Sequence, residues 1–182
     1  GMVMAPNRYT FVLLLGLILL AVLARPAYAK IGEISQVKGS GVLERGSKVV
    51  IDGEVGAGVQ SMDTAVTANG TMRILFVDET RVDITEQSRL EIDEFVYDPA
   101  NDIGSLSIKA SLGTVRYASG QIAKKYKQNV KIRTPSATIG VRGTDFVMVV
   151  DEMGGSMITL LPSCDTGGAC YTGEIKVETD AG

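Results

Sequence analysis

Hydrophobic and polar residues recur with a period of eight between residues 74 and 97, in units that read ILFVDETR, VDITEQSR and LEIDEFVY. Each unit places two hydrophobic residues two positions apart, which puts both side chains on one face of an extended strand. These anchors are Ile74, Phe76, Val82, Ile84, Leu90 and Ile92. Because eight is even, every unit presents the same face. The repeat therefore predicts short strands that share one core.

The same alternation, broken by turn-forming residues, extends over most of the chain. Further strands are expected near residues 31–37, 49–51, 65–67, 106–110, 114–117, 130–134, 137–141 and 175–179, and a hairpin is expected to join 146–150 to 157–161. Asn69-Gly70 is a dipeptide favoured where both central turn residues have positive φ. Only residues 119–127 resemble a helical turn.

Composition supports the all-β interpretation. From Lys30 onward the chain has 17 Val, 13 Ile and 13 Thr but only 7 Leu. Residues branched at Cβ suit a pleated surface, whereas a helical bundle of this size would be rich in Leu and Ala. No long Pro-rich or charged linker divides the sequence. We expect one all-β domain over residues 30–182.

The N-terminal segment has the features of an export signal. Arg8 precedes an uncharged run from Tyr9 to Ala24, and Ala27-Tyr28-Ala29 has the small-residue pattern of a cleavage site. We expect residues 1–29 to be a signal peptide, with an uncleaved membrane anchor as the alternative. Either way the protein is expected to be exported, to the periplasm, the cell surface or the medium. The end of the sequence in the middle of the pattern suggests a longer parent chain.

Several motifs together resemble a known family. They are Leu75-Phe76-Val77-Asp78, Ser88-Arg89-Leu90-Glu91-Ile92-Asp93, Tyr97-Asp98-Pro99, Gly113-Thr114-Val115-Arg116 and the segment from Thr134 to Thr144. The sequence resembles the FecR-like periplasmic domain of bacterial envelope proteins. The resemblance implies a β-solenoid-like stack or sandwich of short strands. The namesake proteins of this family are transmembrane regulators, whose periplasmic part senses a siderophore-loaded receptor and whose cytoplasmic segment controls a σ factor. For stand-alone exported members the resemblance implies no settled role.

This chain departs from those regulators at its N-terminus. Only about eight residues precede the hydrophobic run, too few to fold a cytoplasmic domain. We therefore expect the periplasmic module without the σ-regulating segment. Its partner is expected to be an envelope protein. A structural, self-assembling envelope protein is the second hypothesis, and an enzyme that acts on polysaccharide is the third.

The side-chain chemistry excludes several classes of enzyme. The chain has no His, which rules out Ser-His-Asp and Cys-His nucleophile systems. Cys164 and Cys170 enclose a short, Gly-rich tip and are expected to form a disulfide in an oxidising compartment, with reduced or intermolecularly paired thiols as alternatives. We expect no metal and no cofactor.

Acidic residues are numerous but scattered. Asp83, Glu91 and Asp93 alternate with core anchors, so they are expected to point outward as solubilising charges rather than to form a hydrolytic pair. Asp98, Asn101 and Asp102 lack the spacing of a dedicated Ca²⁺ loop and predict a plain turn.

Basic residues concentrate in one stretch of the sequence, made of Lys124, Lys125, Lys127, Lys131 and Arg133. The stretch is a candidate partner-binding surface, with an ordinary solvated face as the alternative. From Lys30 onward 16 basic against 21 acidic residues give a net charge of −5, which argues against a nucleic-acid partner.

The segment most typical of the family is expected to have a structural role. Its residues of interest are Thr134, Pro135, Gly140, Arg142, Gly143 and Thr144. Gly140 and Gly143 are expected to form sharp corners with positive φ, and Arg142 to satisfy backbone carbonyls there.

Overall fold

The computed structural model describes residues 29–179, and almost all of the regular structure is β. The strands are β1 (Gly32–Lys38), β2 (Gly41–Arg45), β3 (Val49–Asp52), β4 (Gly58–Val59), β5 (Thr64–Thr67), β6 (Thr71–Phe76), β7 (Arg81–Ile84), β8 (Arg89–Asp98), β9 (Ile103–Ala118), β10 (Val130–Arg133), β11 (Ala137–Arg142), β12 (Asp145–Val150), β13 (Ser156–Leu161), β14 (Ser163–Cys164), β15 (Cys170–Tyr171) and β16 (Glu174–Thr179). A 3-10 turn, η1 (Pro99–Asn101), and one short helix, α2 (Gln121–Lys125), complete the description.

The predicted signal peptide lies outside the described residues, apart from its last position. Within residues 29–179, no helix has the length and hydropathy needed to cross a bilayer. The single all-β domain that the sequence predicted is confirmed.

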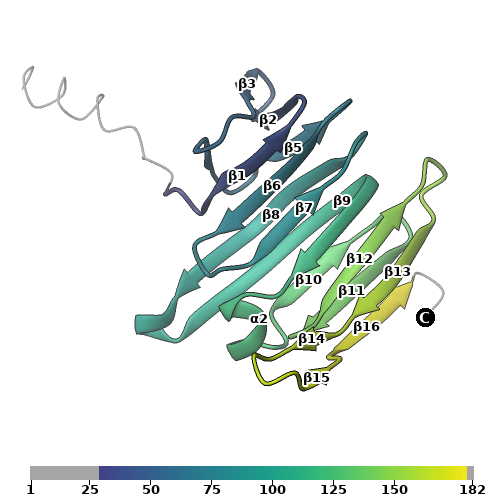
Figure 1. Ribbon diagram of the computed structural model, residues 1–182. Coiled ribbons are helices and arrows are strands. Elements are labelled where there is room, and N and C mark those ends of the chain that lie inside the picture. Colours follow the sequence, from purple (N-terminus) through teal and green to yellow (C-terminus); the bar gives the residue numbers. More distant parts are fainter. Residues whose placement is uncertain (1–28, 180–182) are drawn as a thin grey trace, which may run out of the picture.

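Fourteen of the described strands form one curled sheet with two halves (Figure 1). In the first half-sheet the order is β4-β1-β6-β7-β9-β12-β13, and in the second it is β3-β2-β5-β8-β9-β10-β11-β16. The long strand β9 belongs to both halves: residues 103–112 pair with β8, and residues 113–118 pair with β7 and β12. Neighbouring strands are antiparallel except for β9 and β10, which run parallel.

The chain passes repeatedly from one half-sheet to the other, so the fold is a stack of V-shaped rungs. The rungs are β1–β2, β5–β6, β7–β8, the two parts of β9, and β11–β12. Successive rungs follow the chain from one end of the sheet to the other (Figure 1). The corners need unusual backbone conformations, with φ of 75° at Gly39, 51° at Gln87, 98° at Gly113 and 68° at Gly143. The stack of short strands is confirmed, but its rungs pair antiparallel, and the parallel coiling of a solenoid is not confirmed.

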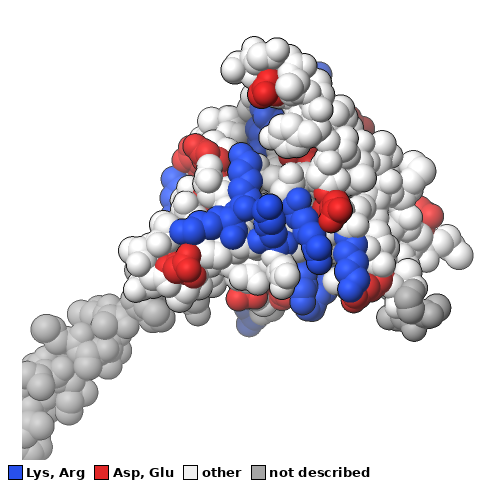
Figure 2. Space-filling model, turned by 90° about the horizontal axis from the view of Figure 1, so that it is seen from below, with Lys and Arg blue, Asp and Glu red and all other residues white. Residues whose placement is uncertain are grey.

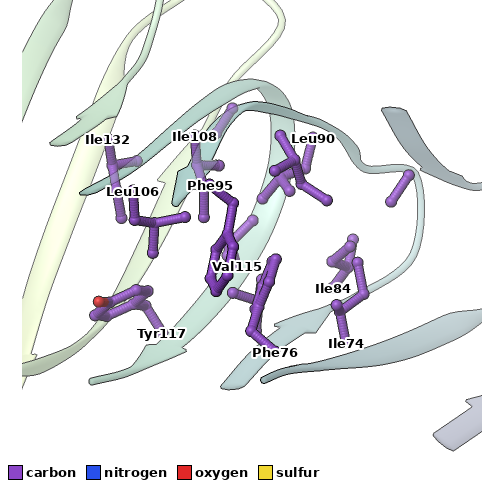
Figure 3. Close-up of a cluster of buried hydrophobic side chains, with 14 of the residues drawn as sticks. Ile74, Phe76, Ile84, Leu90, Phe95, Leu106, Ile108, Val115, Tyr117 and Ile132 are labelled. Atoms are coloured by element: carbon purple, nitrogen blue, oxygen red, sulfur yellow. The ribbon is translucent and has the colours of Figure 1, made fainter. Parts of the chain in front are cut away.

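The core lies between the two half-sheets (Figure 3). All six anchors of the eight-residue repeat are at most 2% exposed, as the repeat predicted. Phe76 of the first half-sheet stacks on Phe95 of the second with ring centroids 5.1 Å apart. The units of the repeat are connected in two different ways. A hairpin joins β6 to β7 within the first half-sheet, whereas a corner leads from β7 to β8 in the second half-sheet.

Two local expectations were wrong. Neither Asn69 nor Gly70 has positive φ, because this dipeptide forms a corner between half-sheets and not a two-residue hairpin. The strands expected near 106–110 and 114–117 are parts of the single strand β9, which bends at Gly113. The expected hairpin is confirmed as β12 and β13.

A buried carboxylate fixes the start of α2. Asp78, in the β6–β7 turn, is 1% exposed. Its side chain accepts hydrogen bonds from the Thr80 N–H at 3.0 Å, the Thr80 hydroxyl at 2.8 Å and the Ile122 N–H at 3.0 Å, and its carbonyl accepts one from the Gln121 N–H at 2.8 Å. These bonds hold the N-terminal end of α2 against the first half-sheet.

Candidate binding surface

The basic stretch begins on α2 and continues along the outer face of the second half-sheet. Lys124 and Lys125 lie in the last turn of α2, and Lys127 follows the helix; all three are exposed. Val130 and Ile132 of β10 point into the core, so Lys131 and Arg133 point outward. Figure 2 shows Lys and Arg side chains gathered on the end of the molecule where α2 lies.

The structure divides these five residues by the carboxylates around them. The Lys125 ammonium is 3.3 Å from the Asp102 carboxylate, and a hydrogen bond to Asp102 raises the pKa of Lys125. Within the described chain, the other four residues, Lys124, Lys127, Lys131 and Arg133, have no carboxylate within 4.0 Å. Their charge is therefore available to a partner.

Two further cations, which sequence reasoning missed as part of this surface, complete it. Lys131 of β10 is in register with Gly140 of β11, and Gly140 is in register with Lys176 of β16. Arg142 lies one outward position along β11. These residues and Lys127 line a hollow of about 270 Å³. The alternation of inward and outward residues along the sequence indicates that Lys176 points outward, but only the pairing of β11 with β16 shows which residues lie beside it.

The residues of the family-typical segment lie in a turn, a strand and a corner of the fold, and two of the expectations about them were wrong. Thr134 closes the turn from β10 to β11, where its hydroxyl accepts hydrogen bonds from the Ala137 N–H at 3.0 Å and the Ser136 N–H at 3.3 Å. Gly143 has the expected positive φ, but Gly140 lies within β11 and does not. The Arg142 side chain is 4.0 Å from Glu174 and, in the described chain, bonds no carbonyl of the corner.

The other two residues of the segment lie at its ends. Pro135 is exposed in the β10–β11 turn, where its ring approaches Gly154 of the β12–β13 turn. Thr144 is 1% exposed, and its carbonyl accepts a hydrogen bond from the Ser119 hydroxyl at 2.7 Å. Both residues join neighbouring segments of the fold.

Most of the acidic residues considered as candidate sites form ion pairs with nearby cations or close a turn. Asp83 forms an ion pair with Arg73, and Asp93 lies 3.4 Å from the Lys109 ammonium. Asp98 accepts hydrogen bonds from Asn101 and closes the η1 turn. Among the described residues, no three His, Cys, Asp or Glu side chains gather in a way that could hold a metal ion.

The predicted disulfide is confirmed. Cys164 and Cys170 are bonded across the hairpin of β14 and β15. The Asp165 side chain orders the tip of this hairpin by accepting hydrogen bonds from the N–H groups of Gly167 and Ala169, both at 2.9 Å. The hairpin connects β13 to β16, the last strands of the two half-sheets.

Comparison with known proteins assigns the family. The family model described as FecR protein matches residues 63–162, which is more than half of the chain. The chain belongs to the FecR family. FecR proteins take part in signalling and sensing. No curated protein and no solved structure matches the chain.

The residues matched by the family model include the candidate binding surface except for the part on β16. Residues 63–162 run from the start of β5 to the end of β13 and include α2, β10 and β11. Lys127, Lys131, Arg133 and Arg142 therefore lie on the FecR domain itself, whereas Lys176 lies on β16, beyond the matched residues.

Proposed function

We propose that this FecR protein is a non-catalytic, exported module that binds a protein partner in the bacterial envelope, in the periplasm or at the cell surface, and so serves signalling. The binding surface is the basic stretch of Lys124, Lys125, Lys127, Lys131 and Arg133. The observation that carries the proposal is that Lys127, Lys131 and Arg133 are exposed with no carboxylate within 4.0 Å in the described chain. A partner with an acidic surface would complement them.

The family supports this function. FecR proteins act in regulation and signalling rather than catalysis. Asp83 and Asp93 of the eight-residue repeat lie on outer faces and form ion pairs with Arg73 and Lys109, respectively. Such carboxylates stabilise the surface charge balance and do not face one another across a cleft, as glycoside hydrolysis would need.

The proposal is tested by affinity capture from envelope extracts with immobilised protein. We expect the wild-type protein to recover one defined partner, and the triple variant Lys124→Glu, Lys125→Glu, Lys127→Glu to lose it. The control is a triple variant with the same change of net charge on exposed lysines elsewhere, namely Lys30→Glu, Lys38→Glu, Lys48→Glu. Recovery of no specific partner, or equal loss in both variants, would contradict the proposal.

A second candidate function, self-assembly into an envelope structure, rests on the last rung. Strands β13 and β16 each pair with only one described strand. Their inward side chains are incompletely covered, with Leu160 38% and Val177 47% exposed. Unpaired edges with apolar side chains are templates for further strands. Sedimentation velocity at increasing protein concentration tests this alternative, since a monomer at every concentration would exclude it.

A further inference from the structure

A groove with charged walls crosses three strands of the second half-sheet. Lys131, Gly140 and Lys176 lie side by side on β10, β11 and β16. Adjacent strands are about 4.8 Å apart, so the two lysines start about 10 Å apart with only a glycine between them. Lys127 and Arg142 close the hollow, whose volume is about 270 Å³.

The fold itself does not require glycine at position 140. Gly140 lies inside a regular strand and does not have positive φ. A Cβ atom added there would meet its nearest neighbour, the Cβ of Lys176, at 3.7 Å, an ordinary van der Waals contact. The absence of a side chain has one structural effect, which is to leave an open floor between two lysines.

The groove carries an excess of positive charge. Lys127 and Lys131 have no carboxylate within 4.0 Å in the described chain, and Arg142 approaches Glu174 only to 4.0 Å. Glu178 is the one acidic residue among those that line the groove, and it is 2.9 Å from the Lys176 ammonium. The ligand of this groove should therefore be an anion.

The chemistry of the lining favours carboxylates of a peptide. None of the described residues that line the groove is aromatic, so it offers no ring on which a sugar could stack. Phosphate sites commonly use backbone N–H groups at a helix N-terminus or in a nest, whereas here the backbone is engaged in the pairing of β10, β11 and β16. Exposed lysines act as separate point charges, which suits carboxylates spaced along a chain.

We infer that the groove seats an extended acidic segment of the protein partner, an inference that rests on the proposed function. Alternate side chains of an extended peptide point the same way and are about 7 Å apart. Two acidic residues at alternate positions can thus reach Lys131 and Lys176, while the peptide backbone lies over Gly140.

The test is direct binding of a fluorescein-labelled peptide of alternating Glu and Ser, followed by fluorescence anisotropy at low salt. Gly140→Leu fills the floor of the groove without a change of charge, and Gly140→Ala is its matched control. Lys131→Gln removes a groove cation, and Lys48→Gln removes an equal charge from an exposed position outside both the groove and the basic stretch. Far-UV circular dichroism and thermal unfolding verify that each variant is folded.

We expect Gly140→Leu and Lys131→Gln to weaken peptide binding about tenfold, and Gly140→Ala and Lys48→Gln to stay within about twofold of the wild type. Equal binding by Gly140→Leu and the wild type would overturn the inference, because binding would then be diffuse surface attraction. Tighter groove binding of inorganic phosphate or of vesicles of phosphorylated lipid would overturn the choice of a peptide.

Failure of the groove assignment can be distinguished from failure of the proposed function. If the wild-type protein captures a partner from extracts and Gly140→Leu retains it, the groove assignment fails while the proposed function stands. If no partner is captured although the peptide binds at the groove, the proposed function fails instead.

Discussion

Replacement of Gly113 by alanine tests how closely the corners of the rungs pack on one another. Gly113 lies where β9 passes between half-sheets and has a φ of 98°. A Cβ atom at this position would lie 2.0 Å from the Ser88 hydroxyl oxygen and 2.6 Å from the Ser88 Cα of the neighbouring corner. Ser88 is 1% exposed and cannot move without displacing the corner from β7 to β8.

Gly56 provides a matched control, because its φ is 90° but an added Cβ would meet nothing within 4 Å. Both variants incur the cost of a side chain at positive φ, about 1–2 kcal/mol. Only Gly113→Ala adds the overlap, which costs about 1–3 kcal/mol in a packed interior. We therefore expect losses in the free energy of unfolding of about 2–5 kcal/mol for Gly113→Ala and about 1–2 kcal/mol for Gly56→Ala.

Urea unfolding followed by far-UV circular dichroism measures both values, and the slope against urea concentration verifies that the unfolding transition is unchanged. In a domain of this size each kcal/mol lowers the midpoint of thermal unfolding by about 2–4 °C, so the difference is also visible on heating. Equal destabilisation by the two variants would refute the reasoning, since the corner at Gly113 would then have room that the structure does not show.

Two further predictions concern buried polar groups. Asp78→Ala removes the acceptor for the N–H groups of Thr80 and Ile122, so we expect the free energy of unfolding in urea to fall by about 3 kcal/mol. The control Asp83→Ala breaks a half-exposed ion pair and should cost less than about 1 kcal/mol. Equal losses in the two variants would contradict this prediction. Burial raises the pKa of the Tyr117 hydroxyl. The unfolded chain therefore releases this proton first, and stability is expected to fall as pH rises above about 10. Tyr117→Phe should remove this part of the alkaline loss, and an unchanged pH profile of the urea midpoint would contradict the assignment.

The inward face of the fold could be predicted from the sequence because it depends on local alternation. Ile74, Val82 and Leu90 needed only the two-residue period and the even spacing of the repeat to be placed in the core. Strand positions followed in the same way. The hydrophobic effect acts on each strand separately, so the signal is present in every short window.

The path between strands could not be predicted from the same signal. Hairpins and corners both favour Gly, Asn or Asp, so Asn69-Gly70 fits either connection. The burial of Asp78 depends on Ile122, which is 44 residues away. The meeting of Lys131 with Lys176 depends on two strand pairings across β11. Strand register between distant segments cannot be read from a local sequence pattern. For that reason the sequence did not predict that Arg142 and Lys176 belong to the groove.

The stacked rungs also have a consequence for the dynamics of the domain. Each strand is hydrogen-bonded only to the strands beside it, so local opening can begin at an end of the stack without separation of the middle. The terminal strand β16, which carries Lys176, is held by β11 alone among the described strands. The groove therefore includes an edge segment that can detach without opening the middle of the stack, and an occupant that spans β10, β11 and β16 would hold this segment in place as it binds.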